Sequence, residues 1–323
     1  MCTALRFPQG DCYLGRTLDL EYRYDEAVVI TPRGYRFKHK KGTDFNTELA
    51  IAGIATVKDG YPLYYDAVNE AGLFMAGLNF TGNAKFSKVE DSRTPLAQYE
   101  LIPFVLGHAR TLRAAADILK NVRLVDTPYD ESTPVSELHY FLGDSSKSLA
   151  AEPCEEGFAI YEDPFDVLTN NPPFPYHKDN IQNYLNLTAK EAENRFSANI
   201  PLRATSRGIG AFGLPGDLSS PSRFIRAAFA VSNAEQKKTE SEEVGQVFHV
   251  LDTVSQTEGL VRLESGLERT QYAVCANLRT GTYYYKTYSN SRISAVTMTE
   301  AARNCDSLSE YPLRFCEDIY YVN

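Results

Sequence analysis

The residue best suited to chemistry is Cys2, which directly follows the initiator Met1. If Met1 is removed, Cys2 carries both a thiol and a free α-amine. A thiolate attacks carbonyl carbon readily, and an α-amino group with a pKa of about 7.7–8.0 can accept a proton near neutral pH. Cys2 could therefore supply the nucleophile and the general base of one acyl-transfer reaction. Its position alone does not distinguish this role from that of an ordinary buried thiol.

Several polar residues stand at the ends of apolar segments, from where the fold could bring them to Cys2. Taken singly, each is equally explained by a cap, a turn or a surface ion pair, because Asn and Asp favour such positions. As a set they offer the charges and amide donors that acyl transfer at a carbonyl requires. These candidates are Arg16, Asp19, Asn79, Asn170, Asn171, Arg223 and Arg226.

The sequence contains no other motif whose flanking residues support a known chemistry. Residues 208–213 match the spacing GxGxxG, but no strand precedes them and Pro215 follows where a helix should begin. The five histidines and six cysteines show no metal-ligand spacing, and no HExxH, GxSxG or P-loop sequence occurs. The sequence therefore predicts a glycine-rich loop here, and neither a dinucleotide nor a metal site.

Composition narrows the class of protein. The 323 residues are 43% hydrophobic and 23% charged, as in globular proteins, and the net charge of −9 argues against a nucleic-acid partner. No apolar run is long enough to span a membrane, and no signal-like segment precedes Cys2. With six scattered cysteines, these features predict a cytoplasmic protein with free thiols and no membrane partner.

The elements that must position the candidates alternate between strands and helices. Strands at 2–8 and 12–18 flank the turn Pro8-Gln9-Gly10-Asp11, and such a hairpin would lay Arg16 and Asp19 beside the chain start. Further strands are predicted at 26–32, 49–55, 72–80, 138–143, 147–152, 157–162, 166–169, 271–277, 282–288 and 292–298, helices at 96–106, 111–120, 177–198, 222–231 and 241–255, and an exposed loop at 33–46. This order predicts one α+β domain over 1–323, with antiparallel sheets covered by helices.

Taken together, these segments resemble the choloylglycine hydrolase family, which contains bile salt hydrolases and penicillin V acylases. The matching segments follow the family's order: Met1-Cys2-Thr3, Gly15-Arg16-Thr17-Leu18-Asp19, Asn69-Glu70-Ala71-Gly72-Leu73, Ala76-Gly77-Leu78-Asn79-Phe80, Leu168-Thr169-Asn170, Gly213-Leu214-Pro215-Gly216-Asp217, Ser222-Arg223-Phe224 and Tyr283-Tyr284-Tyr285. The resemblance implies the fold of an N-terminal nucleophile hydrolase, which is a four-layer αββα sandwich of two antiparallel sheets between helix layers.

The resemblance also implies a catalytic set. In it, Cys2 is the nucleophile once Met1 is lost, Asp19 lies against its α-amine, and Arg16 lies near its thiol. Two asparagines surround the oxyanion, and an arginine that directly follows a serine completes the set. The full set is Cys2, Arg16, Asp19, Asn79, Asn170 and Arg223.

The implied reaction is hydrolysis of an amide through a Cys2 thioester, with no metal or organic cofactor. Bile salt hydrolases typically carry Asn at the position of Asn79, whereas penicillin V acylases carry Tyr, so bile salts conjugated to glycine or taurine are the expected substrates. The family's habit further implies a homotetramer. We expect residues 208–216 to form a lid and an apolar wall to receive the steroid, built from Leu18, Leu20, Tyr24, Tyr65, Tyr129 and Val135.

Two alternatives stay open at this point. The chain could be an acylase of penicillin V or of another N-acyl amide, which differs from the leading hypothesis in the amide turned over fastest. It could also be a non-catalytic protein that binds amphipathic molecules. A chain that keeps Met1 would fit that second alternative, because its Cys2 nitrogen is an amide and cannot act as a base.

Overall fold

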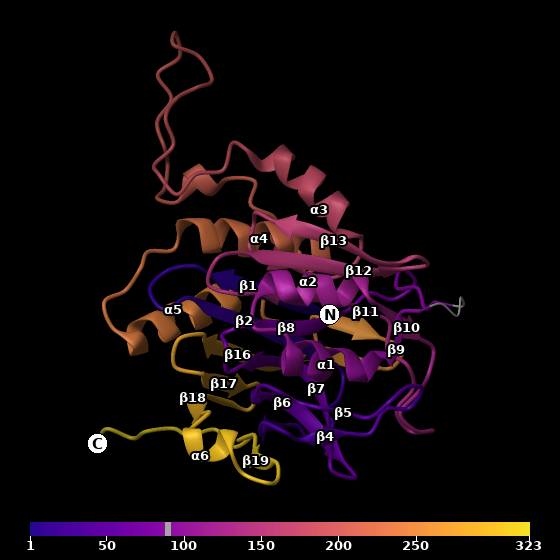
Figure 1. Ribbon diagram of the computed structural model, residues 1–323. Helices are drawn as coiled ribbons and strands as arrows, with labels where there is room; N and C mark the ends of the chain where they lie inside the picture. The colour runs from indigo at the N-terminus through magenta and orange to yellow at the C-terminus, as the bar shows by residue number, and fades with distance from the viewer. Residues whose placement is uncertain (88–91) are drawn as a thin grey trace.

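The computed structural model describes residues 1–87 and 92–323 and places two large antiparallel sheets between helices (Figure 1). The first sheet has the strand order β14-β1-β2-β16-β17-β18, with β15 paired to β16. Its strands are β14 (Val167–Leu168), β1 (Cys2–Phe7), β2 (Tyr13–Leu20), β15 (Val261–Leu263), β16 (Gly266–Asn277), β17 (Thr282–Thr287) and β18 (Asn290–Thr297). The first strand of the chain is thus hydrogen-bonded on both sides.

The second sheet has the order β13-β12-β11-β8-β7-β6-β3-β19. Its strands are β3 (Ala27–Thr31), β6 (Ile51–Lys58), β7 (Tyr61–Asn69), β8 (Phe74–Asn79), β11 (Leu138–Gly143), β12 (Ser148–Cys154), β13 (Gly157–Asp163) and β19 (Ser309–Pro312). Two further pairs lie outside the large sheets: β4 (Arg36–Phe37) with β5 (Phe45–Asn46), and β9 (Thr94–Ala97) with β10 (Val122–Val125).

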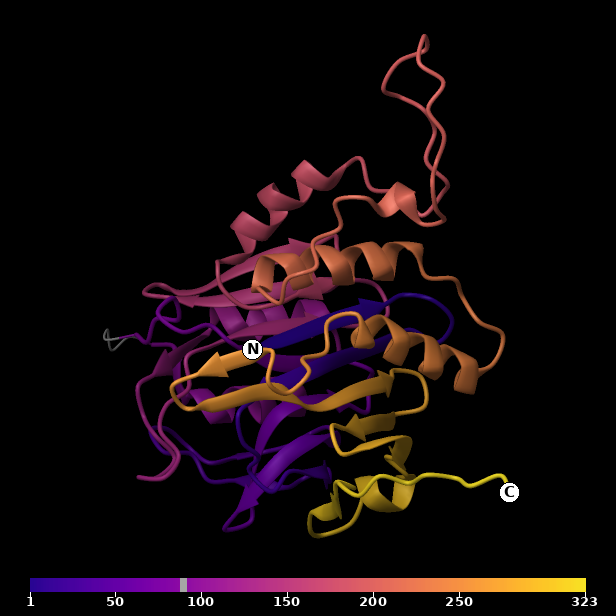
Figure 2. The same cartoon turned by 180° about the vertical axis from the view of Figure 1, so that it is seen from behind.

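Helices cover the outer face of each sheet, which gives four layers. Helices α4 (Ser220–Asn233) and α5 (Glu240–Asp252) lie across β1, β2 and β16, as the view from behind shows (Figure 2). Helices α1 (Leu101–His108) and α2 (Leu112–Lys120) cover the second sheet. The order αββα confirms the fold predicted from the sequence.

Burial of apolar side chains explains this layering. One core cluster joins the two sheets to each other and joins the first sheet to α4 and α5, with Leu14, Leu78 and Phe224 fully buried in it. A second cluster fills the space between the second sheet and α1 and α2. Because both faces of β1 are covered, all six of its residues are buried, which places Cys2 inside the protein.

Every predicted strand is present in the structure, but β7, β10, β15 and β19 were not predicted, and three further segments differ from the prediction. Residues 94–97 form a strand rather than the start of a helix, because they pair in parallel with β10. The loop predicted at 33–46 contains the β4–β5 pair, which buries Phe37 completely. The helix predicted at 177–198 is wrong beyond Tyr184, since only α3 (Phe174–Asn180) and the 3-10 turn Ile181–Tyr184 are helical.

The segment 185–208 instead leaves the body of the protein as a long excursion beyond α3 (Figures 1 and 2). It has no regular structure, and its sequence offers no apolar stripe that a helix could bury. A 3-10 turn at Ile209–Ala211 follows, and a short helix, α6 (Glu300–Arg303), precedes β19. Within the described residues, no helix is long and apolar enough to cross a membrane.

Candidate active site

Cys2 begins β1, and only 3% of its surface is exposed. The hairpin register pairs Cys2 with Leu18 and Ala4 with Arg16, which brings the Arg16 side chain to the thiol. Its guanidinium nitrogen Nη2 lies 2.8 Å from Cys2 Sγ. The guanidinium therefore donates a hydrogen bond to the sulfur and places a buried positive charge beside it. The prediction that the hairpin carries Arg16 to Cys2 is confirmed.

Arg16 is fully buried and is held by groups from the second sheet and from β16 and β17. Its Nη1 bonds the Oδ2 atom of Asp66 at 3.2 Å and the carbonyl of Tyr65 at 3.3 Å. Asp66 also accepts hydrogen bonds from the hydroxyls of Tyr272, at 2.8 Å, and Tyr283. Burial raises the pKa of Asp66, and the Arg16 guanidinium opposes that rise. The ion pair thus fixes the guanidinium against the sulfur.

Removal of Asp66 should test this network through stability. Asp66→Ala leaves Arg16 as an uncompensated buried cation, so we expect the free energy of unfolding to fall by about 3–5 kcal/mol. Urea denaturation followed by circular dichroism measures it. The control is Glu162→Ala, which breaks a surface pair with Lys147 whose side chains are 66% and 50% exposed and should stay close to wild type. Equal stability of the two variants would contradict the network.

Asn170 and Arg223 hold the main chain of Cys2. The Cys2 N–H donates to Asn170 Oδ1 at 2.8 Å, and Arg223 Nη2 donates to the same oxygen at 2.7 Å. Arg223 Nη1 donates to the carbonyl of Cys2 and to Thr3 Oγ1. Burial lowers the pKa of Arg223. In this form of the protein both residues therefore orient the peptide groups of the nucleophile rather than its thiol.

Asn79 lies beside Asn170, whose Nδ2 donates to the Asn79 carbonyl at 2.8 Å. The Asn79 side chain is turned to Thr81, whose N–H and hydroxyl donate to its Oδ1. The Phe80 N–H donates to the Glu137 carbonyl. Because hydrogen-bonded and non-hydrogen-bonded pairs alternate along an antiparallel ladder, the N–H and C=O of the preceding residue, Asn79, point away from β11, on the side of Asn170. On this side the two residues therefore offer two donors, the Asn79 main-chain N–H and the second Nδ2 hydrogen of Asn170.

Asp19 continues the hairpin ladder by one residue. Its N–H donates to the Met1 carbonyl at 2.8 Å, and its carbonyl accepts from the Met1 ammonium at 2.6 Å. Its carboxylate accepts hydrogen bonds from the hydroxyls of Thr270, at 2.6 Å, and Thr17, at 3.4 Å. The hairpin thus places the Asp19 main chain against Met1, while the Asp19 carboxylate binds threonines in this form of the protein.

Two buried carboxylates at this site, Asp66 and Glu268, were not predicted from the sequence. Glu268 accepts the ammonium of Met1 at 2.8 Å. The sequence could have identified Asp66, because it is the one charged residue in strand β7. The sequence does not distinguish Glu268, since it lies on β16 among polar and charged neighbours.

Two histidines support the strand end that carries Asn170. His177 Nε2 lies 3.0 Å from the Asn170 carbonyl, and His139 Nε2 lies 2.8 Å from that of Thr169. Each ring stacks on a phenylalanine, His177 on Phe224 and His139 on Phe80, and burial lowers the pKa of His177. Because they bind main-chain carbonyls, these histidines have a structural role.

The candidate steroid wall divides into two groups. In the first group, Leu18 lies opposite Cys2 in the ladder, and half-buried Leu20 packs against the same core. The carbonyl of Tyr65 accepts a hydrogen bond from Arg16, and the ring of Tyr65 stacks on that of Tyr24, with the ring centres 6.3 Å apart. Tyr129 belongs to a separate aromatic cluster with Tyr61 and Tyr99, and half-buried Val135 follows it in the same loop. In the expected lid, Phe212 is 81% exposed.

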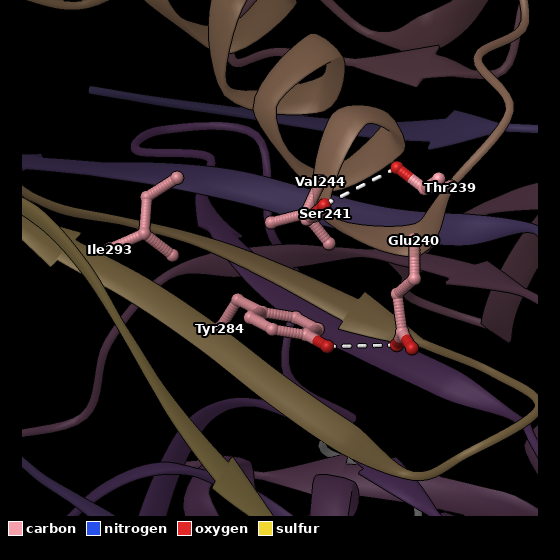
Figure 3. Close-up of a pocket in the computed structure, with 6 residues that line it drawn as sticks. All are labelled: Thr239, Glu240, Ser241, Val244, Tyr284 and Ile293. Atoms are coloured by element: carbon pink, nitrogen blue, oxygen red, sulfur yellow. Dashed lines mark hydrogen bonds between the residues drawn. The ribbon is translucent and has the colours of Figure 1, made fainter.

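A surface hollow of about 530 Å³ shares no residue with this site. It lies at the start of α5, where the Tyr284 hydroxyl donates to Glu240 at 2.8 Å (Figure 3). The residues that line it are Thr239, Glu240, Ser241, Val244, Tyr284 and Ile293. No residue of the predicted catalytic set or steroid wall is among them.

Comparison with known proteins gives consistent matches over the whole chain. Residues 2–311 match the model of the linear amide C-N hydrolases, choloylglycine hydrolase family. The chain is 41% identical to a bile salt hydrolase/transferase of Lactiplantibacillus plantarum, over 100% of both chains. It is 35% identical to a bile salt hydrolase/transferase of Bifidobacterium longum, over 93% of this chain and 96% of that one.

Solved structures agree with these matches. A crystal structure of a conjugated bile acid hydrolase variant from Clostridium perfringens has a TM-score of 0.91 and 30% identity, with 100% of both chains covered. Penicillin V acylase from Agrobacterium tumefaciens has a TM-score of 0.76 at 18% identity, over 96% of this chain and 90% of that one. At that identity the acylase shares the fold, and the likeness extends no further.

Proposed function

Since the chain belongs to the choloylglycine hydrolase family of linear amide C-N hydrolases, we propose that it is a hydrolase of glycine- and taurine-conjugated bile salts. The observation that carries this function is the arrangement at Cys2, where a buried guanidinium lies 2.8 Å from the sulfur. This arrangement occurs in a chain whose relatives with 41% and 35% identity are named bile salt hydrolases.

The first half of the reaction forms a thioester. Loss of Met1 frees the Cys2 amine, and Arg16 favours the thiolate. The sulfur attacks the amide carbonyl while the amine holds the proton of the thiol. The oxyanion accepts hydrogen bonds from the Asn79 main-chain N–H and Asn170 Nδ2, and one well-aimed donor of this kind contributes about 3–4 kcal/mol. The amine then gives the proton to the leaving nitrogen, and glycine or taurine departs.

The second half releases the bile acid. A water molecule takes the place of the departed amine and loses a proton to the neutral Cys2 amine as it attacks the thioester carbonyl. The same donors hold the second oxyanion. When the C–S bond breaks, the proton returns to the sulfur and the free carboxylic acid leaves. Every proton transfer thus uses the amine of Cys2.

The choice of substrate is tested by parallel assays on glycocholate, taurocholate and penicillin V. We expect the bile salts to have a kcat/KM at least about tenfold higher than penicillin V, a difference of about 1.4 kcal/mol in transition-state binding. The mass of the N-terminal peptide should be measured in the same preparation, so that a slow rate is not due to retained Met1. Faster turnover of penicillin V would contradict the proposed substrate class.

We further propose a homo-oligomer, a tetramer by family resemblance, in which segment 185–208 contacts a second copy. This segment leaves the body of the protein, and its Leu185 and Phe196 are 88% and 80% exposed, an amount of apolar surface that favours a covered interface. Phe196→Ser should therefore lower the mass found by light scattering. Leu260→Ser, at a residue 66% exposed outside the segment, is the control. An unchanged mass in Phe196→Ser would contradict this interface.

We also propose that the protein is cytoplasmic and acts as one domain. All six cysteines are free, which suits a reducing compartment. The site itself spans the chain, because β1 pairs with β14 and with β2, and β2 pairs with β16. Division of the chain between these strands would separate Cys2 from its partners.

A further inference from the structure

Glu268 has no part in the mechanism above, although it lies at the start of the chain. Its side chain is 4% exposed, and its Oε2 lies 2.8 Å from the ammonium of Met1. Among the described residues its other oxygen, Oε1, is buried and has no hydrogen-bond partner. Within that part of the chain, the ammonium is therefore the only hydrogen-bond partner of the carboxylate.

The sheet places Glu268 on the same face as the carboxylate of Asp19. Thr270 pairs directly with Asp19 across β16 and β2, and its hydroxyl donates to Asp19 at 2.6 Å. Side chains two residues apart on a strand share one face, so Glu268 is the diagonal neighbour of Asp19. Two carboxylates from adjacent strands thus flank the amino terminus.

Removal of Met1 takes away the partner of Glu268 and creates a new cation close to it. Nitrogen atoms of neighbouring residues in an extended chain are about 3.5 Å apart, so Glu268 Oε2 lies at most about 6–7 Å from the Cys2 nitrogen. An unpaired buried carboxylate is costly, and the Cys2 ammonium is the nearest new charge. Glu268 can reach it by side-chain rotation or through one water molecule in the space of Met1.

We propose that Glu268 is a second carboxylate of the Cys2 amine, a positioning residue that holds the ammonium together with Asp19 and sets the pH at which the amine becomes a base. This role rests on the proposed function, because it describes the mature enzyme. In the form with Met1, the same carboxylate holds the ammonium of Met1, which is the contact observed.

The sign of the effect follows from the charges that face the amine. They are Asp19 and Arg16 on β2, Glu268 on β16, Arg223 on α4 and the Cys2 thiol itself, with Asp66 behind Arg16 on the second sheet. A negative charge nearby raises the pKa of an ammonium and of a thiol. Removal of the Glu268 charge should therefore lower both pKa values and move the acid limb of activity to lower pH.

Glu268→Gln tests this proposal. We expect the midpoint of the acid limb of kcat/KM on glycocholate to fall by about one pH unit, the lower end of the shifts that a charge at 4–6 Å produces. The pH midpoint of Cys2 alkylation by iodoacetamide, followed by peptide mass spectrometry, should fall with it. Glu268→Asp keeps the charge and should keep both midpoints near wild type.

Glu264→Gln is the matched control, because Glu264 is exposed and lies four residues before Glu268 in the sequence. It should leave both midpoints unchanged. If Glu268→Gln does not fold, Glu268→Met removes the charge without a buried polar atom and should give the same shifts. Unchanged midpoints in a folded, uncharged variant overturn the proposal. If neither the wild type nor any variant hydrolyses bile salts, the proposed function is wrong. The pH midpoint of Cys2 alkylation then tests the role of Glu268 by itself.

Discussion

Cys2→Ala is expected to lower kcat on glycocholate and taurocholate by at least about 10⁴-fold, since loss of a catalytic nucleophile costs up to about 10⁶-fold. The variant keeps its α-amine and the buried Arg16, but it has no atom that can form the acyl intermediate. Hydrolysis rates at matched enzyme concentration measure the loss. A wild-type rate would rule out Cys2 as the nucleophile.

Binding should survive this substitution. Cys2 is 3% exposed, so loss of its sulfur leaves the outer wall around Leu18 and Tyr65 unchanged. Isothermal titration with taurocholate should give a Kd within about threefold of the KM of the wild type where chemistry is slower than dissociation. A Cys2→Ala protein that neither binds nor turns over bile salt would instead indicate a disrupted fold, which circular dichroism detects.

Retention of Met1 is expected to have the second largest effect, a loss of about 10²–10⁴-fold, because it removes the general base while leaving the thiol in place. The Cys2 nitrogen is then an amide that donates to Asn170 Oδ1 at 2.8 Å and cannot accept a proton. Expression with methionine aminopeptidase inhibited should give this form. Bile salt turnover by the purified protein should then fall in proportion to the fraction of chains that keep Met1.

The matched control is the same chain expressed without the inhibitor, with its N-terminal mass verified. Both preparations contain Cys2, Arg16 and Asp66, so any difference in rate belongs to the amine. The alkylation rate of Cys2 should still be measurable in both, because both forms keep the thiol. If full activity accompanies full retention of Met1, the α-amine is not the base.

Local patterns predicted most of the fold. The turn Pro8-Gln9-Gly10-Asp11 identified the hairpin, and apolar strand runs identified most strands of the two sheets, with β7, β15 and β19 as the exceptions. The error at 177–198 arose because a polar segment with good helix formers lacks an apolar face, and burial rather than propensity decides whether a helix forms. Strand β9 was missed because its stability comes from Val122–Val125, which lies far along the chain.

Site residues could be predicted where the hairpin register or a family motif identifies them. They could not be predicted where only packing between distant segments brings them to the site. The hairpin register predicted that Arg16 lies near Cys2, and the family motifs named Asn79, Asn170 and Arg223. Asp66 and Glu268 were not predictable, because their partners are distant. Asp66 meets Tyr272 across 206 residues, and Glu268 meets Met1 across 267. Only the packing of one sheet on the other and the pairing of β2 with β16 create these contacts.

In the folded chain, the groups around the peptide bond between Met1 and Cys2 are held by hydrogen bonds. Its carbonyl accepts from Asp19, its N–H donates to Asn170, and the ammonium in front of it is held by Glu268. A trimming enzyme must draw this bond into its own cleft, so it has access only before β1 enters the sheet. In the proposed mechanism, removal of Met1 therefore competes with folding, and we expect a chain that folds first to keep Met1 and to be inactive. We therefore expect the specific activity of a preparation to follow the fraction of chains that lost Met1 before folding, and faster synthesis to lower it.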